Sequence, residues 1–185
     1  MRQVNTDNVK EAGDFERLAP GGYVCKIVNV VDVPMNPSTE KGDYLWIDFD
    51  IAEGEFKGYY ARLEENLKFW GGKFIRSYKE NALPMFKRMC SVVTNSNPGF
   101  VFDGGRQNSD EKTLVGKFIG LVLGEEEYMG NDGNLKTRLY VVRECAVDEI
   151  RAGKYRVPEQ KKLSTKNEEG FVKTAADPTI EVPFS

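Results

Sequence analysis

The sequence contains no histidine, and it has only three cysteines. Histidine is the usual general base and the commonest metal ligand, so Ser-His-Asp and Cys-His catalysis and histidine-containing metal sites are excluded. Cys25, Cys90 and Cys145 are far apart and form no Cys-x-x-Cys pair, which indicates reduced, mostly buried thiols and no zinc site. These absences favour a binding protein over an enzyme, and we expect no cofactor and no bound metal.

Long apolar runs are also absent. No stretch approaches the roughly 18 residues that cross a membrane, and the first residues lack the apolar segment of a signal peptide. We therefore expect a cytoplasmic protein with no membrane partner. The 185 residues are 40% apolar, which is enough for one domain with a core and polar tails.

Charge is distributed unevenly along the chain. The net charge is −3, but residues 56–93 contain eight basic and three acidic residues, which gives +5 and leaves about −8 for the rest. The distribution of charge decides the partner more than its sum does. A nucleic-acid partner therefore remains compatible with the acidic total.

Alternating apolar and polar residues predict five short strands. The first covers residues 22–33 and the second residues 44–53, in which Leu45, Ile47, Phe49 and Ile51 face the core. Gly54 and Glu55 predict a tight turn into a third strand over residues 56–62, which would complete a hairpin. Residues 115–126 and 134–146 form the fourth and fifth strands, joined by a turn over residues 127–133 that carries an Asp-Gly signal.

Helical spacing is clearest over residues 80–93. Pro84 can occupy the first turn, and one face carries Leu83, Phe86, Met89, Cys90 and Val93. Residues 147–153 predict a second, short helix, and residues 67–77 a strand extension or an ordered loop. Residues 1–19 form a polar lead-in with Phe15 and Leu18 as docking points, residues 20–157 the domain, and residues 158–185 a flexible tail.

The order of these elements indicates a fold. Three strands, a helix and two strands is the order of the OB-fold, a small Greek-key barrel, and a five-stranded sandwich is the alternative. We therefore expect an all-β, five-stranded OB-fold barrel with one helix between strands 3 and 4. Such barrels bind oligonucleotides on strands 2 and 3 and on the loops between strands 1 and 2 and strands 4 and 5. Here these are the predicted hairpin over residues 44–62, the loop 34–43 and the turn 127–133.

Several motifs resemble those of single-stranded DNA-binding proteins. Ile180-Glu-Val-Pro-Phe184 resembles the tail of the bacterial proteins, which ends in acids and an Ile-Pro-Phe-like group and recruits replication and repair enzymes. Over residues 20–158 the chain resembles a phage and mobile-element family, through Gly22-Tyr-Val-Cys-Lys-Ile27, Asn97-Pro-Gly-Phe100, Leu114-Val-Gly-Lys-Phe-Ile-Gly120 and Gly124-Glu-Glu-Glu-Tyr128. The resemblance implies an OB-fold protein of DNA replication and recombination that binds single-stranded DNA, with a homodimer as a further option.

The tail resemblance also implies a partner-binding peptide, made of Asp177, Ile180, Glu181, Pro183 and Phe184. Only two of these residues are acidic, where the bacterial tails carry an acidic cluster. Ser185 also follows Phe184, which is the terminal residue in those tails. We therefore expect recruitment of a replication or recombination protein, but not through the same pocket.

Rings that stack on bases and cations that neutralise phosphates are the residues a single-strand binder needs. Tyr44 and Trp46 are predicted on the outer face of strand 2, and residues 136–140 of strand 5 are predicted to alternate, with Leu139 and Val141 inward. The candidate DNA contacts are Tyr44, Trp46, Tyr60, Arg62, Phe69, Trp70, Lys73, Arg76, Lys136, Arg138 and Tyr140. Each also has a plainer interpretation, as a core residue, a lid over the barrel or a solvated face.

Two other functions remain open from the residues alone. One is a barrel that binds only protein, such as a structural or adaptor component of a phage. The other is a metal-dependent nuclease that uses Asp48, Asp50, Glu53 and the segment Glu55-Phe-Lys57, although a hard cation needs converging oxygens and alternating acids on a strand are usually solvated. For the DNA-binding interpretation we expect binding without reaction, affinity that falls steeply with salt, and little base preference.

Overall fold

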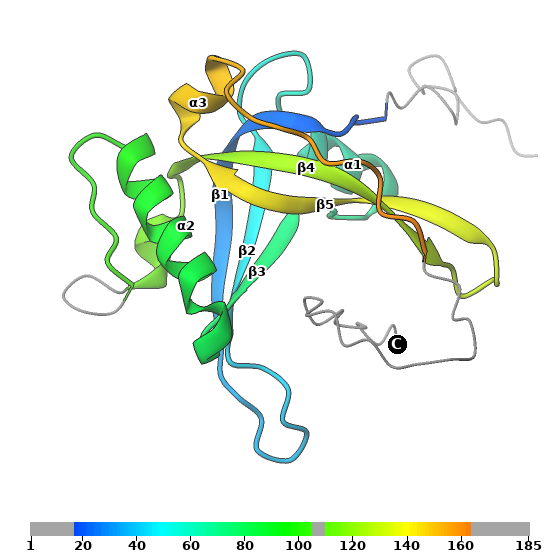
Figure 1. The fold of residues 1–185 in the computed structure, drawn as a ribbon, viewed down its shortest axis with the longest axis horizontal. Helices are drawn as coiled ribbons and strands as arrows, with labels where there is room; N and C mark the ends of the chain where they lie inside the picture. Colours follow the sequence, from blue (N-terminus) through cyan, green and yellow to red (C-terminus); the bar gives the residue numbers. More distant parts are fainter. Residues whose placement is uncertain (1–16, 105–109, 164–185) are drawn as a thin grey trace, which may run out of the picture.

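The computed structural model describes residues 17–104 and 110–163. It is a mostly β structure, with a five-stranded antiparallel sheet in the order β3-β2-β1-β4-β5 (Figure 1). The strands are β1 (Gly21–Val33), β2 (Tyr44–Ile51), β3 (Lys73–Ser77), β4 (Phe118–Met129) and β5 (Leu135–Cys145). The helices are α1 (Tyr59–Leu67), α2 (Leu83–Ser96) and α3 (Val147–Arg151), with 3-10 turns at Glu80–Ala82 and Glu111–Leu114.

The sheet is strongly coiled. β4 pairs with the beginning of β1, and β5 pairs with β4 along nearly its whole length. As a result β4 and β5 cross β1, β2 and β3 at a steep angle (Figure 1). Among the described residues, no hydrogen-bonded ladder joins β3 to β5, so the sheet is not closed.

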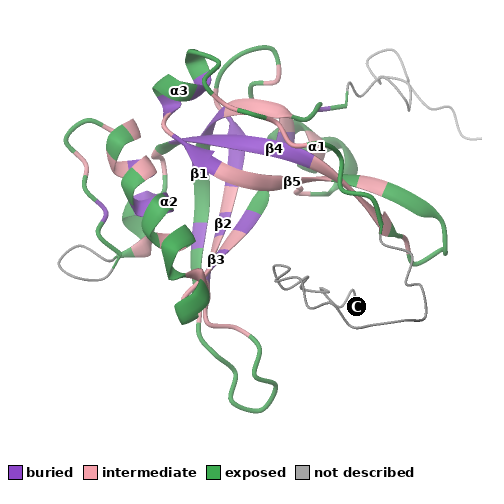
Figure 2. Cartoon of the chain, in the orientation of Figure 1, coloured by how far each residue is buried: buried purple, intermediate pink, exposed green. Residues whose placement is uncertain are grey.

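Four of the predicted strands and both predicted helices are confirmed, with ends that differ by a few residues. The alternation of β2 is confirmed in detail, because Leu45, Ile47, Phe49 and Ile51 are all at most 2% exposed. The helix between β3 and β4 is also confirmed, and it buries Met89, Cys90 and Val93. Figure 2 shows the buried residues along the central parts of the strands and on one side of α2.

The predicted third strand over residues 56–62 is wrong, and so is the hairpin that it would have formed. Gly54 and Gly58 both adopt positive φ, at 80° and 71°, and the chain turns there into α1. Gly58 provides no side-chain cap; instead, the buried Asp50 carboxylate accepts hydrogen bonds from the backbone N–H of Tyr60 (2.9 Å) and Ala61 (3.2 Å). The third strand is residues 73–77, within the segment that we expected to be a strand extension or a loop.

The main core lies between the coiled strands. Phe49 is its largest fully buried side chain, and its ring contacts the rings of Tyr60 (centroids 5.4 Å apart) and Phe74 (5.9 Å). Leu18, which we expected to dock the lead-in onto the domain, belongs to this core and is 1% exposed. A smaller cluster joins α3 to β4 and β5 through Val122, Val147 and Ile150.

A buried ion pair joins the two outermost strands where the ladder is missing. Arg76 of β3 donates from Nε to Glu144 of β5, and the two side chains are 4% and 1% exposed. The Arg76 guanidinium also lies 4.8 Å from the ring centroid of Phe74. Partners in a buried pair of this kind depend on each other, because either charge alone would be buried without compensation.

The segment after α3 returns along β4. Lys161 donates from its backbone N–H to Glu125 and accepts from the backbone N–H of Glu127, both at 2.9 Å. Residues 158–163 of the predicted tail therefore lie along β4, and the rest of that tail is outside the described residues. None of the helices in the described ranges is long and apolar enough to cross a membrane.

Candidate functional site

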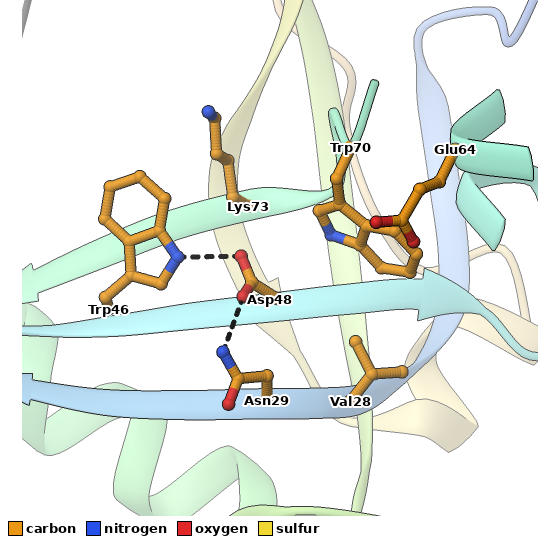
Figure 3. A pocket seen from close by; sticks show the side chains of 7 residues that line it. All are labelled: Val28, Asn29, Trp46, Asp48, Glu64, Trp70 and Lys73. Carbon is orange, nitrogen blue, oxygen red and sulfur yellow. Dashed lines mark hydrogen bonds between the residues drawn. The ribbon is translucent and has the colours of Figure 1, made fainter. Parts of the chain in front are cut away.

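A shallow, open pocket of about 440 Å³ lies on the outer face of β1, β2 and β3. It is lined by Val28, Asn29, Trp46, Asp48, Glu64, Trp70 and Lys73 (Figure 3). We call it the tryptophan pocket. Strand register explains its composition, because Asn29, Asp48 and Lys73 form one cross-strand row. A bulge between Ile27 and Asn29 leaves both Val28 and Asn29 exposed on this face.

Asp48 organises one side of the tryptophan pocket. Its Oδ1 accepts a hydrogen bond from Trp46 Nε1 at 2.7 Å, and its Oδ2 accepts one from Asn29 Nδ2 at 2.9 Å. The Lys73 ammonium lies 5.2 Å from the centroid of the Trp46 ring. Figure 3 shows the Asp48 carboxylate between the two indoles. Trp46 is therefore held by its polar edge and by a cation near its ring.

Trp70 is positioned by the segment that leads from α1 into β3. Its Nε1 donates to the Gly72 carbonyl at 3.0 Å, and its ring packs against Tyr60 with centroids 6.2 Å apart. Gly72 has to be glycine, because a Cβ there would lie 2.2 Å from the Phe49 carbonyl oxygen. This close approach of two backbones ties the Trp70 segment to β2, so the ring is held at a defined place on the surface.

The charge of the tryptophan pocket is slightly negative. Lys73 is its only cation among the described residues, and Asp48 and Glu64 are its acids. Two half-buried indoles with one ammonium suit a flat, electron-rich ligand. The pocket by itself does not provide the cationic excess that a polyanion requires.

Three of the candidate DNA contacts meet in the tryptophan pocket: Trp46, Trp70 and Lys73. Tyr44 lies on the outer face of β2, where it pairs with Ser77 and is half-buried. Phe69 is 52% exposed beside Trp70 in the sequence but does not line the pocket. Arg62 is exposed on α1 and donates to the Lys57 carbonyl.

Two of the candidate DNA contacts, Tyr60 and Arg76, are buried. Tyr60 is 5% exposed because it belongs to the first turn of α1, not to a strand; this burial raises the pKa of its phenol well above the usual range. Arg76 is 4% exposed because β3 directs Lys73 and Ile75 outward and Phe74 and Arg76 inward. Neither side chain can stack on a base or contact a phosphate on the outer face.

The candidates on β5 face outward as predicted, and Leu139 and Val141 pack against the main core. However, each already has a partner. Lys136 pairs with Asp132 at 2.8 Å and Arg138 with Glu126 at 2.7 Å. The Lys136 ammonium, with Asn134, lowers the pKa of Asp132 to about 2. The Tyr140 ring lies under the Lys161 ammonium at 4.1 Å, so the structure does not bring this group into the tryptophan pocket.

Two of the acids proposed for a nuclease site, Asp50 and Glu53, make structural hydrogen bonds or ion pairs. Asp50 accepts three backbone N–H groups, from Ile51, Tyr60 and Ala61. Glu53 pairs with Arg151 at 2.6 Å, and the hydrogen bond from Arg151 lowers the pKa of Glu53. Within residues 17–104 and 110–163, no group of three or more cysteines, aspartates or glutamates is placed to hold a metal ion.

Sequence reasoning missed the residues that complete the tryptophan pocket. Asn29 is exposed because of a β-bulge, which has no local signal in the sequence, and Asp48 was considered only as a metal ligand. Phe15 and the partner-binding residues Asp177, Ile180, Glu181, Pro183 and Phe184 lie outside the described residues.

No protein-family model matches this chain, and neither does any curated protein.

Proposed function

We propose that this protein binds single-stranded DNA, without reading its sequence, through the outer face of β1, β2 and β3. One observation carries the proposal: the chain has two tryptophans, and both line the same surface pocket. Stacking of a base on an aromatic side chain contributes about 1–3 kcal/mol and tolerates any base. Lys73, 5.2 Å from the centroid of the Trp46 ring, adds a cation beside the stacking surface.

The arrangement of the strands supports the proposal. The order β3-β2-β1-β4-β5, with α2 between β3 and β4, is the order of an OB-fold barrel opened between β3 and β5. The buried Arg76–Glu144 pair joins those two strands at the position where the barrel would close. In OB-folds the oligonucleotide lies over strands 2 and 3, and the tryptophan pocket is on that face.

The proposed mechanism is binding without reaction. Bases stack on Trp46 and Trp70, and basic side chains displace counterions from the phosphates. The protein would act in phage or mobile-element DNA replication or recombination inside a bacterial host, as the resemblance implies. Residues 177–184 would then recruit a partner while the barrel holds DNA.

A titration of the full chain against fluorescently labelled oligo-dT tests this function. We expect the anisotropy to show saturable binding at low salt, much weaker binding to a duplex of the same length, and a steep loss of affinity between 50 and 200 mM salt. Absence of binding at low salt, or equal affinity for duplex and single strand, would contradict the proposal.

A protein-only interaction is the second candidate, and one observation favours it. The tryptophan pocket has one cation and two acids, and exposed apolar side chains lie on the same face, with Val28 38% and Val31 45% exposed. Exposed apolar groups of this kind often mark contacts with other proteins. The oligonucleotide titration separates the candidates, because a protein-only surface would leave the labelled DNA unbound.

A further inference from the structure

A second pocket, of about 290 Å³, lies between the first half of α2 and the end of β5. It is lined by Pro84, Met85, Arg88, Val142, Arg143 and Glu144. We call it the arginine pocket. It shares no residue with the tryptophan pocket, and its character is different, because it has no aromatic ring and two guanidinium groups.

The charge of the arginine pocket is positive. Glu144 is its only acid, and Arg76 already pairs with that carboxylate. The four groups Arg76, Arg88, Arg143 and Glu144 therefore sum to +2. Burial raises the pKa of the nearby Cys145 thiol and Glu149 raises it further, while Arg143 and Arg88 both act to lower it. Both guanidinium groups thus act on one small region beside β5.

Buried donors without acceptors lie in this region. Arg143 Nε and Arg76 Nη2 are inaccessible to solvent and have no hydrogen-bond partner in the described part of the chain. Arg76 is 4% exposed, so water cannot easily satisfy its free N–H groups. A buried, unpaired donor on a charged group is unfavourable, and each such group in a native protein calls for an explanation. An anion with several oxygens in the arginine pocket could accept from Arg143, which lines it, but not from Arg76, which does not.

The start of α2 adds to the positive potential. The helix has 14 residues, no acidic residue in its first turn and no side-chain cap, and Pro84 stands at its beginning. The helix dipole favours an anion at such an end, but the 3-10 turn Glu80–Ala82 precedes it, the Leu83 N–H donates to the Glu80 carbonyl, and Pro84 has no N–H. This contribution is secondary to the arginines, and it has the same sign.

We propose that the arginine pocket binds a phosphodiester group of single-stranded DNA, an inference that rests on the proposed function. A guanidinium group matches two phosphate oxygens at once, which suits Arg88 and Arg143 to this ligand. β3 connects the two pockets. Lys73 lines the tryptophan pocket, and Arg76, about 10 Å further along the strand, pairs with Glu144 of the arginine pocket. The arginine pocket would thus supply the excess of positive charge that the tryptophan pocket lacks.

The first arm of the test measures salt dependence. The double variant Arg88→Gln/Arg143→Gln is compared with Lys87→Gln/Lys112→Gln, which removes the same charge from exposed side chains that line neither pocket. For single strands the slope of log K against log[salt] is about −0.7 per neutralised phosphate. We expect the arginine variant to lose at least one such increment and the lysine control to keep the wild-type slope. Equal slopes in the two variants would overturn the proposal.

The second arm identifies the source of the phosphate. Thermal unfolding of the full chain is followed as inorganic phosphate replaces chloride at constant ionic strength. We expect phosphate to raise the Tm of wild type but not of the arginine variant. A phosphate effect without a change in salt slope would assign the pocket to free phosphate and refute the DNA contact. If the protein binds no oligonucleotide at all, the proposed function fails, and this arm alone decides whether the pocket takes an anion.

Folding of the variants does not confuse the outcome. Arg88 is exposed, so Arg88→Gln alone leaves the core unchanged and is measured in both arms. Arg143→Gln removes the unpaired Nε donor but also a side-chain hydrogen bond to Cys145, so the Tm of this variant is compared with that of Arg88→Gln in both arms. A wild-type salt slope in the folded single variant Arg88→Gln would also count against the proposal.

Discussion

Intrinsic fluorescence gives direct access to the tryptophan pocket, because the chain has no tryptophan outside it. Replacing either indole by alanine removes one stacking surface, at about 1–3 kcal/mol per base. With 1.4 kcal/mol for each factor of ten, we expect the Kd for oligo-dT to rise about 5- to 150-fold in Trp46→Ala and in Trp70→Ala. Trp46→Ala also leaves Asp48 Oδ1 without its indole donor, so it exposes more negative charge to a phosphate.

The structural cost of these changes is small compared with the expected loss of affinity. Trp70→Ala removes one neutral hydrogen bond to the Gly72 carbonyl and one ring contact with Tyr60. Such a hydrogen bond contributes about 1 kcal/mol, and both indoles are half-exposed, so the domain remains folded. Circular dichroism and thermal unfolding verify this. Phe118→Ala is the control, because it removes a 39% exposed ring that does not line the pocket.

The assay combines quenching with anisotropy. Trp46→Phe and Trp70→Phe each leave a single indole, and we expect oligo-dT to quench both remaining signals with the same midpoint as the anisotropy of the labelled DNA. If both alanine variants are folded and bind within twofold of wild type, stacking in this pocket is refuted. If the anisotropy shows binding while neither indole is quenched, the strand binds elsewhere on the protein.

Four further predictions concern the fold and the tail. Asp50→Ala removes the acceptor of three backbone N–H groups, so we expect urea denaturation to show a loss of about 3 kcal/mol, and a smaller loss in Asp50→Asn. Glu144→Gln leaves the Arg76 charge buried and unpaired, at about 3–5 kcal/mol, whereas Arg76→Met/Glu144→Met recovers most of that loss. Burial raises the pKa of Cys90 from 9.0 to about 11, so its contribution to stability is complete below pH 9 and is lost as the pH rises toward 11; Cys90→Ala removes this part of the pH dependence of the unfolding free energy. Deleting residues 177–185 leaves the Tm unchanged and the affinity for oligo-dT unchanged or stronger, and a weaker affinity would show that the tail itself holds DNA.

Alternation made much of the sheet predictable from sequence. In β2, four apolar side chains alternate with polar and aromatic ones, and a period of two determines which face is buried. The same reasoning placed Leu139 and Val141 of β5 against the core. The helical spacing of Met89, Cys90 and Val93 identified the buried face of α2. These elements are encoded by neighbouring residues, so a local pattern is sufficient.

The third strand was mispredicted because its replacement depends on a distant residue. Residues 56–62 are rich in aromatics, which favours a strand, but the first turn of α1 is capped by Asp50, ten residues before Tyr60. The burial of Arg76 was not predictable for a similar reason, because its partner Glu144 is 68 residues away. A one-residue change in the start of a strand reverses every side chain in it. A local sequence pattern contains neither the Asp50 cap of α1 nor the pairing of Arg76 with Glu144.

The division of charge between the two faces of β3 makes stacking and phosphate contact separable. Residues 69–76 read in the sequence as one strip of rings and cations, but β3 directs Lys73 outward and Arg76 inward to Glu144. Much of the positive charge counted between residues 56 and 93 is therefore not at the tryptophan pocket, whose lining has one ammonium and two carboxylates. Loss of the Trp70 indole removes a contact with a base and uncovers no charge, so it lowers affinity without changing the salt slope, whereas loss of Arg88 and Arg143 changes the slope. If the tryptophan and arginine variants changed the affinity and the salt slope in the same way, the two pockets would not act as separate subsites.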